Sequence, residues 1–211
     1  MARNFNGTTQ YLQAANVNLS DVNKIAIAFW MYWDAFVADD DLCLEHSANH
    51  NNVTDGFMLD PNYSSASGIL VSLKGDVGYS NGHFPRPSAA AWHHYVVNLD
   101  KSKASSEIDS VYVDGVGQTI TLLTDSNNTN NFGDYTLNFM SRNGASLFGA
   151  GRMAELGIWA GRTLTEAEAV ALAAGKSPAL IQANSLRYYW KLLGVTSPEP
   201  EQVNGKTATV T

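Results

Sequence analysis

Two carboxylates at alternate positions come closest to catalytic machinery in this sequence. One residue separates Glu107 from Asp109, so on a β-strand both side chains would point from the same face. Two carboxyl groups about 5 Å apart on one face can hydrolyse a glycosidic bond with retention. The pair directly follows the polar segment 101–106, however, which places it beside a loop. We therefore expect a coincidental match and a chain that is not an enzyme.

Four of the five histidines occur in two close pairs, and neither pair has the spacing of a convincing metal site. His93 and His94 are adjacent, so on a strand they point to opposite faces and cannot share an ion. His46 and His50 have a spacing that suits zinc on a helix, but the residues between them show no helical pattern. We expect His46 and His50 in a loop and His94 in the core.

Aromatic and polar side chains in the segments between predicted strands suit carbohydrate binding. A sugar offers an apolar ring face to an aromatic ring and hydroxyls to amide or charged groups. Packing in the core is the alternative role for each ring. Trp33 is a further aromatic ring that could contribute, and Asn62 and Asn81 are nearby amide groups. The candidate glycan-binding residues are Tyr63, Tyr79, His83, Phe84 and Arg86.

Charge and hydropathy exclude several classes of protein. The chain has 211 residues and a formal net charge of −7, and its Lys and Arg residues form no cluster, so we expect no nucleic-acid partner. No apolar run reaches the roughly 18 residues of a membrane span. The first residues lack the apolar region of a signal peptide, so we expect a mature start. The single cysteine, Cys43, cannot form an internal disulfide, and we expect it buried.

Alternation of side chains with period two is the strongest regular signal. Residues 25–33 are apolar at both alternate sets of positions, which predicts a central strand covered on both sides, with close packing against its small residues. Dense turn signals between short strands favour a sandwich or jelly roll. We predict the further strands at residues 42–45, 56–59, 69–73, 94–99, 110–113, 119–123, 135–140, 152–159 and 187–191.

One helix and several loops complete this prediction. The alanine-rich segment 163–174 begins with capping-box residues and ends at Gly175, which predicts a helix that covers the edge of the sandwich. Gly and Pro residues in 80–87 predict a loop that cannot continue a sheet, and 125–131 reads as a polar surface loop. We expect a final strand at 207–211 to pair beside the N-terminal strand.

Several landmarks occur in an order that resembles a known family. They are FNGTTQYL at 5–12, IAFWMY at 27–32, WHHYVV at 92–97, VYVDG at 111–115, GAGRMAELGIW at 149–159 and LTEAE at 164–168. Together they resemble the laminin-G-like branch of the concanavalin A-like lectin/glucanase superfamily over about residues 3–193. The resemblance implies one all-β domain over residues 1–211, a jelly roll of two antiparallel sheets. In the glucanase pattern of this superfamily, Glu-x-Asp-x-x-Glu, the third carboxylate is replaced here by Tyr112.

The resemblance also implies a calcium ion, which many members of the family carry. Its ligands would lie near a Phe-Asp-Gly turn and in a Gly-x-Ile-Asp-Glu strand. This sequence has Asn6 at the first place and Ala154 where the aspartate of the strand would stand, while Glu155 remains. Loss of carboxylate ligands weakens a calcium site, so we expect at most a weak one that uses Asn6 and Glu155.

Residues 188–194 (YYWKLLG) and 197–200 (SPEP) additionally look like those of stand-alone laminin-G-like proteins from bacteriophages. We therefore expect a non-catalytic protein on the virion surface, a decoration or adhesion component. Its partners would be capsid or tail proteins, cell-surface glycans, and other copies of itself. The alternative is an extracellular glycan-binding module, and a glycoside hydrolase is the third hypothesis.

Overall fold

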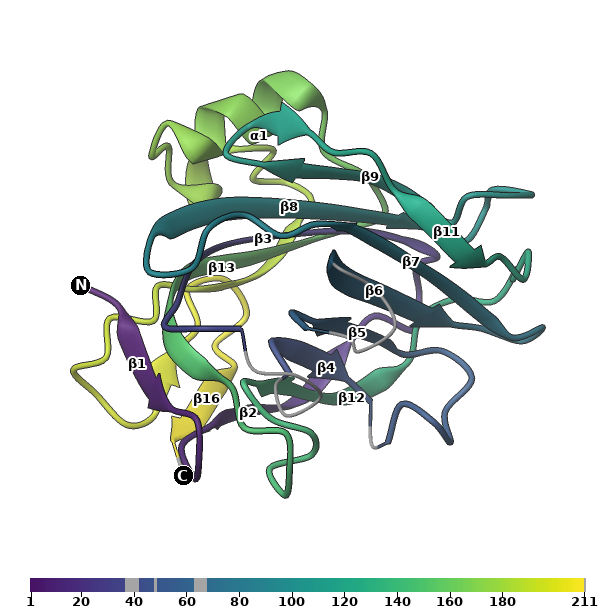
Figure 1. The fold of residues 1–211 in the computed structure, drawn as a ribbon. Coiled ribbons are helices and arrows are strands. Elements are labelled where there is room, and N and C mark those ends of the chain that lie inside the picture. The colour runs from purple at the N-terminus through teal and green to yellow at the C-terminus, as the bar shows by residue number, and fades with distance from the viewer. Residues whose placement is uncertain (37–41, 48, 63–67, 211) are drawn as a thin grey trace.

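Two antiparallel sheets lie face to face in the computed structural model of this chain (Figure 1). The structure describes residues 1–36, 42–47, 49–62 and 68–210. Sheet A contains, in spatial order, β1 (Arg3–Asn6), β13 (Ala150–Ala160), β3 (Lys24–Trp33), β8 (Trp92–Asp100), β9 (Ile108–Val113) and β10 (Val116–Gly117), and β14 (Leu186–Trp190) also pairs with β13.

Sheet B is larger and lies on the other side of the core. Its spatial order is β11 (Thr121–Thr124), β7 (Tyr79–Pro85), β6 (Gly68–Lys74), β5 (Phe57–Asp60), β4 (Leu44–His46), β12 (Asp134–Phe139), β2 (Leu12–Asn18), β16 (Thr207–Val210) and β15 (Glu199–Pro200). The two sheets confirm the predicted jelly-roll sandwich. Within the described ranges no helix has the length and apolar character needed to cross a membrane.

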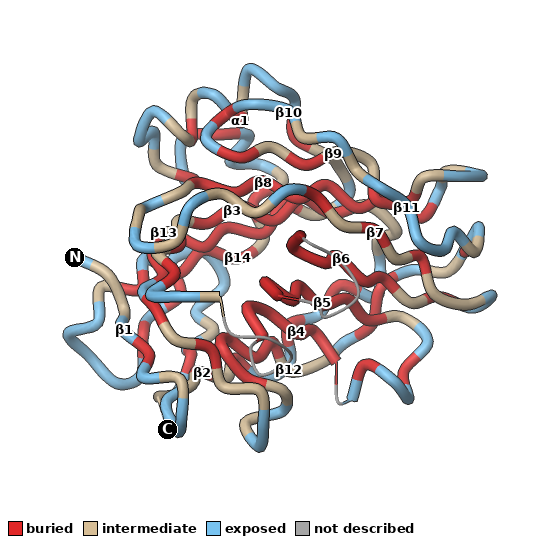
Figure 2. The backbone as a smooth tube through the Cα atoms, in the orientation of Figure 1, coloured by how far each residue is buried: buried red, intermediate tan, exposed pale blue. Residues whose placement is uncertain are grey.

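The alternation in β3 places two different sets of side chains on its two faces. Ile25, Phe29 and Met31 belong to the main core between the sheets. Ala26 and Ala28 face outward and belong to a second, smaller core. Figure 2 shows the buried strands in the middle of the molecule and the exposed segments around them. Residues at alternate strand positions point to opposite faces, so the two-sided burial of β3 confirms the prediction for a central strand.

The second core lies beneath the helix α1 (Glu166–Ala173), which covers the outer face of sheet A (Figure 1). Thr165 caps its N-terminus: the Thr165 hydroxyl accepts from the Glu168 N–H at 3.4 Å, and the Glu168 carboxylate accepts from the Thr165 N–H at 2.8 Å. The short 3-10 helix η1 (Pro178–Leu180) follows. Asn98 of β8 bonds both the C=O and the N–H of Leu164 and so attaches this segment to the sheet.

Three expectations for the rest of the chain were wrong. Residues 79–85 form β7 and not a loop, because Pro85 stands at its last position and the site of Gly82 is packed against Ile108 and Ile120. The final strand pairs with β2 in sheet B, while the first strand pairs with β13 in sheet A. Segment 125–131 is not wholly on the surface, since Asn128 is completely buried.

Candidate functional site

A row of polar side chains crosses the outer face of sheet B. Register pairs Asn81 with Ser72, Ser72 with Met58, Met58 with Glu45, and Glu45 with Asn138, on five neighbouring strands. Directly paired residues present their side chains on the same face of a sheet. Three of these polar residues, Ser72, Glu45 and Asn138, are nevertheless buried. His50, which follows β4, and Arg142, which follows β12, cover this face through their contacts with Ser72 and Glu45.

A hydrogen-bonded chain of three side chains runs along this row. His50 Nε2 lies 2.7 Å from Ser72 Oγ, and Ser72 Oγ donates to Asn81 Oδ1 at 2.6 Å. A serine hydroxyl has one proton, so its donation to Asn81 makes His50 Nε2–H the donor to Ser72. Burial, with Arg142 and Lys74 as smaller causes, lowers the pKa of His50 to about 3, so the ring is neutral at neutral pH. This hydrogen-bond direction leaves the Asn81 amide NH₂ as a donor that has no partner among the described residues.

Around this chain lies a hollow of about 480 Å³, which we call the sheet B hollow. Its polar lining includes Asp60 of β5, Asn81 of β7 and Arg142 after β12, and Met58 and Leu70 give it an apolar floor. A mixture of carboxylate, amide and guanidinium groups over an apolar floor suits a ligand that has both hydroxyls and C–H faces. The full lining is His50, Asn51, Met58, Asp60, Leu70, Ser72, Tyr79, Asn81, Arg142 and Leu147.

Tyr79 stands at the rim of the sheet B hollow. Its ring centroid is 5.7 Å from that of His50, and the Lys74 ammonium lies 4.6 Å from it. The hydroxyl of Tyr79 donates to the backbone carbonyl of Asn51 at 3.4 Å. The half-buried ring is therefore held in place beside the polar row and presents part of its surface to the hollow.

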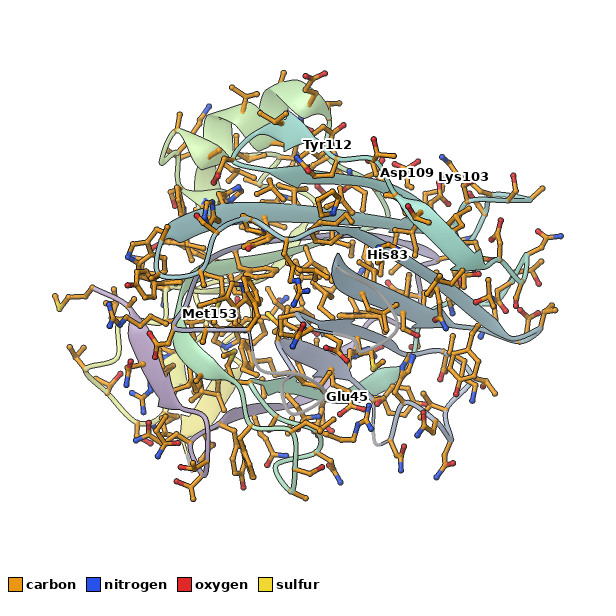
Figure 3. The ribbon with its side chains drawn as sticks, in the orientation of Figure 1. Glu45, His83, Lys103, Asp109, Tyr112 and Met153 are labelled. Carbon is orange, nitrogen blue, oxygen red and sulfur yellow. The ribbon has the colours of Figure 1, made fainter. Side chains whose placement is uncertain are left out.

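The predicted glycan-binding residues separate into different environments. Tyr79 lines the sheet B hollow, and His83 lies farther along the same outward face of β7 (Figure 3). Phe84 points the other way and is buried in the main core, as is Trp33, so neither ring is at the surface. Arg86 bonds Asn62 and lies over the ring of Phe36. Tyr63 falls outside the described residues.

Glu107 and Asp109, the two carboxylates of the hydrolase hypothesis, have structural partners. Glu107 is completely buried and accepts from Ser80 Oγ at 2.7 Å and from Asn128 Nδ2 at 2.9 Å. Asp109 lies beside Lys103 near the start of β9, where the two carry an ion pair (Figure 3). The burial of Glu107 removes it from any surface that a polysaccharide reaches, which favours a structural role for this carboxylate.

In each histidine pair, the two side chains lie on opposite faces of one sheet. His93 is paired with core-facing Met31 and His94 with outward-facing Trp30, as expected for neighbours on a strand. His46 is part of β4 and not of a loop, and its Nε2 lies 2.7 Å from the carbonyl oxygen of Val17. Its ring stacks on core residue Phe57, so sheet B lies between His46 and His50. Among the described residues no three His, Cys, Asp or Glu side chains gather as metal ligands would.

The two residues of the expected calcium site lie apart on sheet A. Asn6 is opposite Ala150, at the start of β13, and its Oδ1 accepts from the backbone N–H groups of residues 8–10. Glu155 lies five positions farther along β13, which corresponds to about 16 Å at the rise of a strand. Its carboxylate accepts from the Tyr189 hydroxyl. The structure does not bring these two side chains to one point, and each already has hydrogen-bond partners of its own.

Ser72, Asp60 and Arg142 of the sheet B hollow were not found from the sequence, and His50 was weighed only as a metal ligand. Ser72 lies in a correctly predicted strand, and its outward direction could have been derived from the alternation with Val71 and Leu73. The pairing of Ser72 with Asn81 depends on the register between two strands, which period-two alternation alone does not fix. Arg142 reaches the hollow from a distant loop, for which no local signal exists.

Solved structures of the same architecture come from several kinds of protein. The SAP-like pentraxin from Limulus polyphemus has a TM-score of 0.61 and 10% identity, over 99% of this chain and 94% of the pentraxin. Domain 4 of AbnA, an arabinanase from Geobacillus stearothermophilus seen with arabinotriose, has a TM-score of 0.62 and 16% identity over 82% of this chain and 76% of that one. A tailspike domain of bacteriophage CBA120 has a TM-score of 0.58 and 12% identity over 87% of this chain and 28% of that one.

At these identities the likeness shows the fold and nothing about the ligand. No curated protein matches the chain by sequence. A family model, described as the concanavalin A-like lectin/glucanases superfamily, matches residues 6–170. This match runs from the last residue of β1 into α1. It includes most strands of both sheets and every residue that lines the sheet B hollow, while β14, β15 and β16 lie beyond it. The chain belongs to the concanavalin A-like lectin/glucanases superfamily.

Proposed function

We propose that this protein is a glycan-binding module and that the sheet B hollow is its binding surface. The observation that carries the proposal is the directed chain from His50 through Ser72 to Asn81, which holds the amide group of Asn81 in a fixed orientation at the wall of the hollow. Fixed hydrogen-bond donors and acceptors beside an apolar floor are what a saccharide needs, because its hydroxyls and C–H groups occur on the same ring. The family to which the chain belongs includes lectins.

The charges in the sheet B hollow favour a neutral saccharide. Arg142 lies over Glu45, with 3.8 Å between Nε and Oε1, so these two opposite charges largely offset each other. Lys74 lies beside Tyr79 at the rim, and Asp60 lies on the opposite side of the row. No single sign of charge dominates the lining, so hydroxyl groups are the ligand groups that match it best.

Binding without catalysis is part of the proposal. A serine next to a histidine resembles a nucleophile with its base, but Ser72 donates its proton to Asn81 and not to His50. His50 Nδ1, where a triad would have its acid, is buried and has no hydrogen-bond partner among the described residues. The hydrogen bonds from His50 through Ser72 to Asn81 therefore run in the opposite direction to those of an activated serine. We propose that these groups orient a ligand and leave its bonds unchanged.

A glycan array tests this proposal with three versions of the protein. The first is the parent, the second carries Tyr79→Ala and Asn81→Ala, and the third carries Asn184→Ala as a matched change of an exposed amide outside the hollow. We expect the parent and Asn184→Ala to bind the same neutral glycans and the double variant to lose at least about tenfold in signal, since two polar contacts are worth about 1.4 kcal/mol or more. Equal binding by all three versions, or no binding by the parent, would refute the proposal.

We also propose a virion surface as the setting of this module, with capsid or tail proteins as its neighbours. Two observations support it: the likeness of residues 188–194 and 197–200 to stand-alone phage proteins, and the shared fold with a phage tailspike domain. An extracellular module is the alternative. Mass spectrometry of purified particles distinguishes them, because a virion component is present in fixed stoichiometry to the capsid protein and an unattached module is absent.

A further inference from the structure

A second groove lies on the opposite side of the molecule, on the outer face of sheet A beside α1. One part of it is a hollow of about 560 Å³ between α1, η1 and the strands beneath them. Trp30 also lines a second hollow, of about 460 Å³. We call the two together the sheet A groove. Its chief polar and aromatic residues are Trp30, Trp92, Arg152, Glu155, Lys176 and Lys191.

Glu155 is aimed into the groove by an irregular backbone. The register of β13 against β3 shifts between Ala154 and Gly157, and Glu155 at this β-bulge has a φ of 53°. A bulge turns a side chain away from the regular alternation, and a left-handed conformation is costly for a residue with a side chain. The carboxylate of Glu155 accepts from the hydroxyl of Tyr189, which is itself 3.4 Å from Ser177 Oγ. A carboxylate and two hydroxyls thus converge at one end of the groove.

Aromatic rings form the middle of the groove. Trp30 is half-buried, and its ring meets the ring of His94 edge to face at 5.2 Å. Two positions along β3, Tyr32 meets Trp92 in the same way at 5.8 Å, and Trp92 is 39% exposed. The alanines of β3 lie under α1, whereas these large rings stand where the helix no longer covers the sheet. Exposed rings held by edge-to-face contacts provide a rigid apolar surface for a sugar ring.

Cations stand at both ends of this aromatic surface. Lys176 and Lys191 are exposed beside Glu155, and Arg152 lies at the other end with its guanidinium 4.6 Å from the ring of Tyr32. Asp34, 4.0 Å from Arg152, is half-exposed and offsets that charge only weakly. The groove is therefore locally positive on a protein whose net charge is −7.

We propose that the sheet A groove is a second binding site, which takes an acidic oligosaccharide. Its sugar rings would lie on Trp30 and Trp92, its carboxylates would face Lys176, Lys191 and Arg152, and a hydroxyl would donate to Glu155. This ligand differs in charge from the neutral saccharide proposed for the sheet B hollow, and the two sites lie on opposite outer faces of the sandwich. One copy of the protein would thus connect two different glycans.

Calorimetric titration with tetragalacturonic acid tests this site, and the methyl ester of the same tetrasaccharide is the matched neutral ligand. The variant K176Q/K191Q removes two groove charges. The variant K103Q/K206Q removes the same number of charges elsewhere and is the control, and Asn81→Ala reports on the sheet B hollow. Each of these side chains is at least partly exposed, so all variants are expected to fold.

We expect the parent, K103Q/K206Q and Asn81→Ala to bind the acid within about twofold of one another, because remote surface charges contribute little. The methyl ester, and the acid with K176Q/K191Q, should bind at least about tenfold more weakly, as loss of charge-assisted hydrogen bonds predicts. The inference is overturned if the parent does not bind the acid, if the ester binds equally well, or if K176Q/K191Q behaves like its control. Loss of acid binding in Asn81→Ala would place the ligand on sheet B and also overturn it.

Discussion

Glu107 and Asn128 hold each other through two hydrogen bonds, one from the Asn128 backbone N–H to Oε1 and one from its side-chain amide to Oε2 at 2.9 Å. Both residues are completely buried. Ser80 of β7 adds a third bond to the same carboxylate. Glu107 directly precedes β9 of sheet A, so its carboxylate joins that strand to β7 of sheet B and to segment 125–131. A side chain with this many buried partners stabilises the fold.

We expect Glu107→Ala to lower the free energy of unfolding by about 3 kcal/mol or more, since it leaves several buried donors without their acceptor. Urea titration followed by tryptophan fluorescence measures this loss. Asp109→Ala, which removes a partly exposed ion pair, is the matched control and should cost about 1 kcal/mol or less. A Glu107→Ala protein as stable as the parent would show that the carboxylate is not needed for folding and would reopen the hydrolase hypothesis.

Stability should fall steeply in mild acid because three histidines are buried in their neutral form. Burial lowers the pKa of His46 and of His94 to about 4 and that of His50 to about 3, against 6.5 in the unfolded chain. Between these values the unfolded state binds more protons than the folded state, so stability is lost as the pH falls through 6.5 toward about 4. Each histidine contributes about 1.4 kcal/mol per pH unit within that window.

Urea titrations at about pH 7.5 and about pH 5 measure this effect, because histidines of the unfolded chain take up protons between these two limits. We expect a loss of several kcal/mol. Replacement of His94 by Gln should reduce the pH dependence by about one histidine's share. A free energy of unfolding that stays constant over this range would contradict the burial of the three rings.

Asn98 is expected to control the attachment of α1 to sheet A. Its side chain bonds Leu164 O at 2.8 Å and Leu164 N at 3.0 Å, and all of these groups are buried. Asn98→Ala leaves two backbone groups unpaired, which should cost about 2–4 kcal/mol. Hydrogen exchange should show faster exchange of the α1 amides than in the parent, with the sheet B amides unchanged. Unchanged exchange in α1 would show that the apolar contacts of the second core suffice.

The fold prediction was correct for elements whose sequence signal lies entirely within their own residues. The alternation of residues 25–33 is complete within β3, and the capping box of Thr165 and Glu168 is local to α1. The prediction for residues 80–87 failed because Gly and Pro were taken as breaks, although Pro85 occupies the end of β7, where a strand tolerates it. Local signals therefore predicted which elements form but not where each of them begins and ends.

The candidate site depends on contacts between distant segments and was found only in part. Tyr79 was predicted and lies at the rim of the sheet B hollow, but Phe84 has the opposite parity on the same strand and is buried. A correct strand assignment for β7 would have separated the two. His50 and Arg142 reach the hollow from different loops, so their roles follow from tertiary packing and not from spacing in the sequence.

Calcium binding at Asn6 or Glu155 can be tested without any glycan. The Asn6 Oδ1 already accepts three backbone N–H groups, and the Glu155 carboxylate accepts from Tyr189. An ion would have to replace these bonds, so we expect the Tm to be the same with excess Ca²⁺ and with a chelator. Scanning calorimetry under the two conditions decides this point. A Tm that rises with Ca²⁺ and is restored to its first value by the chelator would show that a site exists.

Glycan binding by the sheet B hollow is tested most directly by a nuclear magnetic resonance titration of the ¹⁵N-labelled protein with a mixture of neutral oligosaccharides. If the sheet B hollow binds glycans, the shifted signals will belong to the amides of β5, β6 and β7 and to the side-chain NH₂ of Asn81. The same titration of Asn81→Ala will then show weaker shifts. Shifts confined to sheet A, or an unchanged spectrum at saturating saccharide, would contradict the proposal that this hollow is the glycan site.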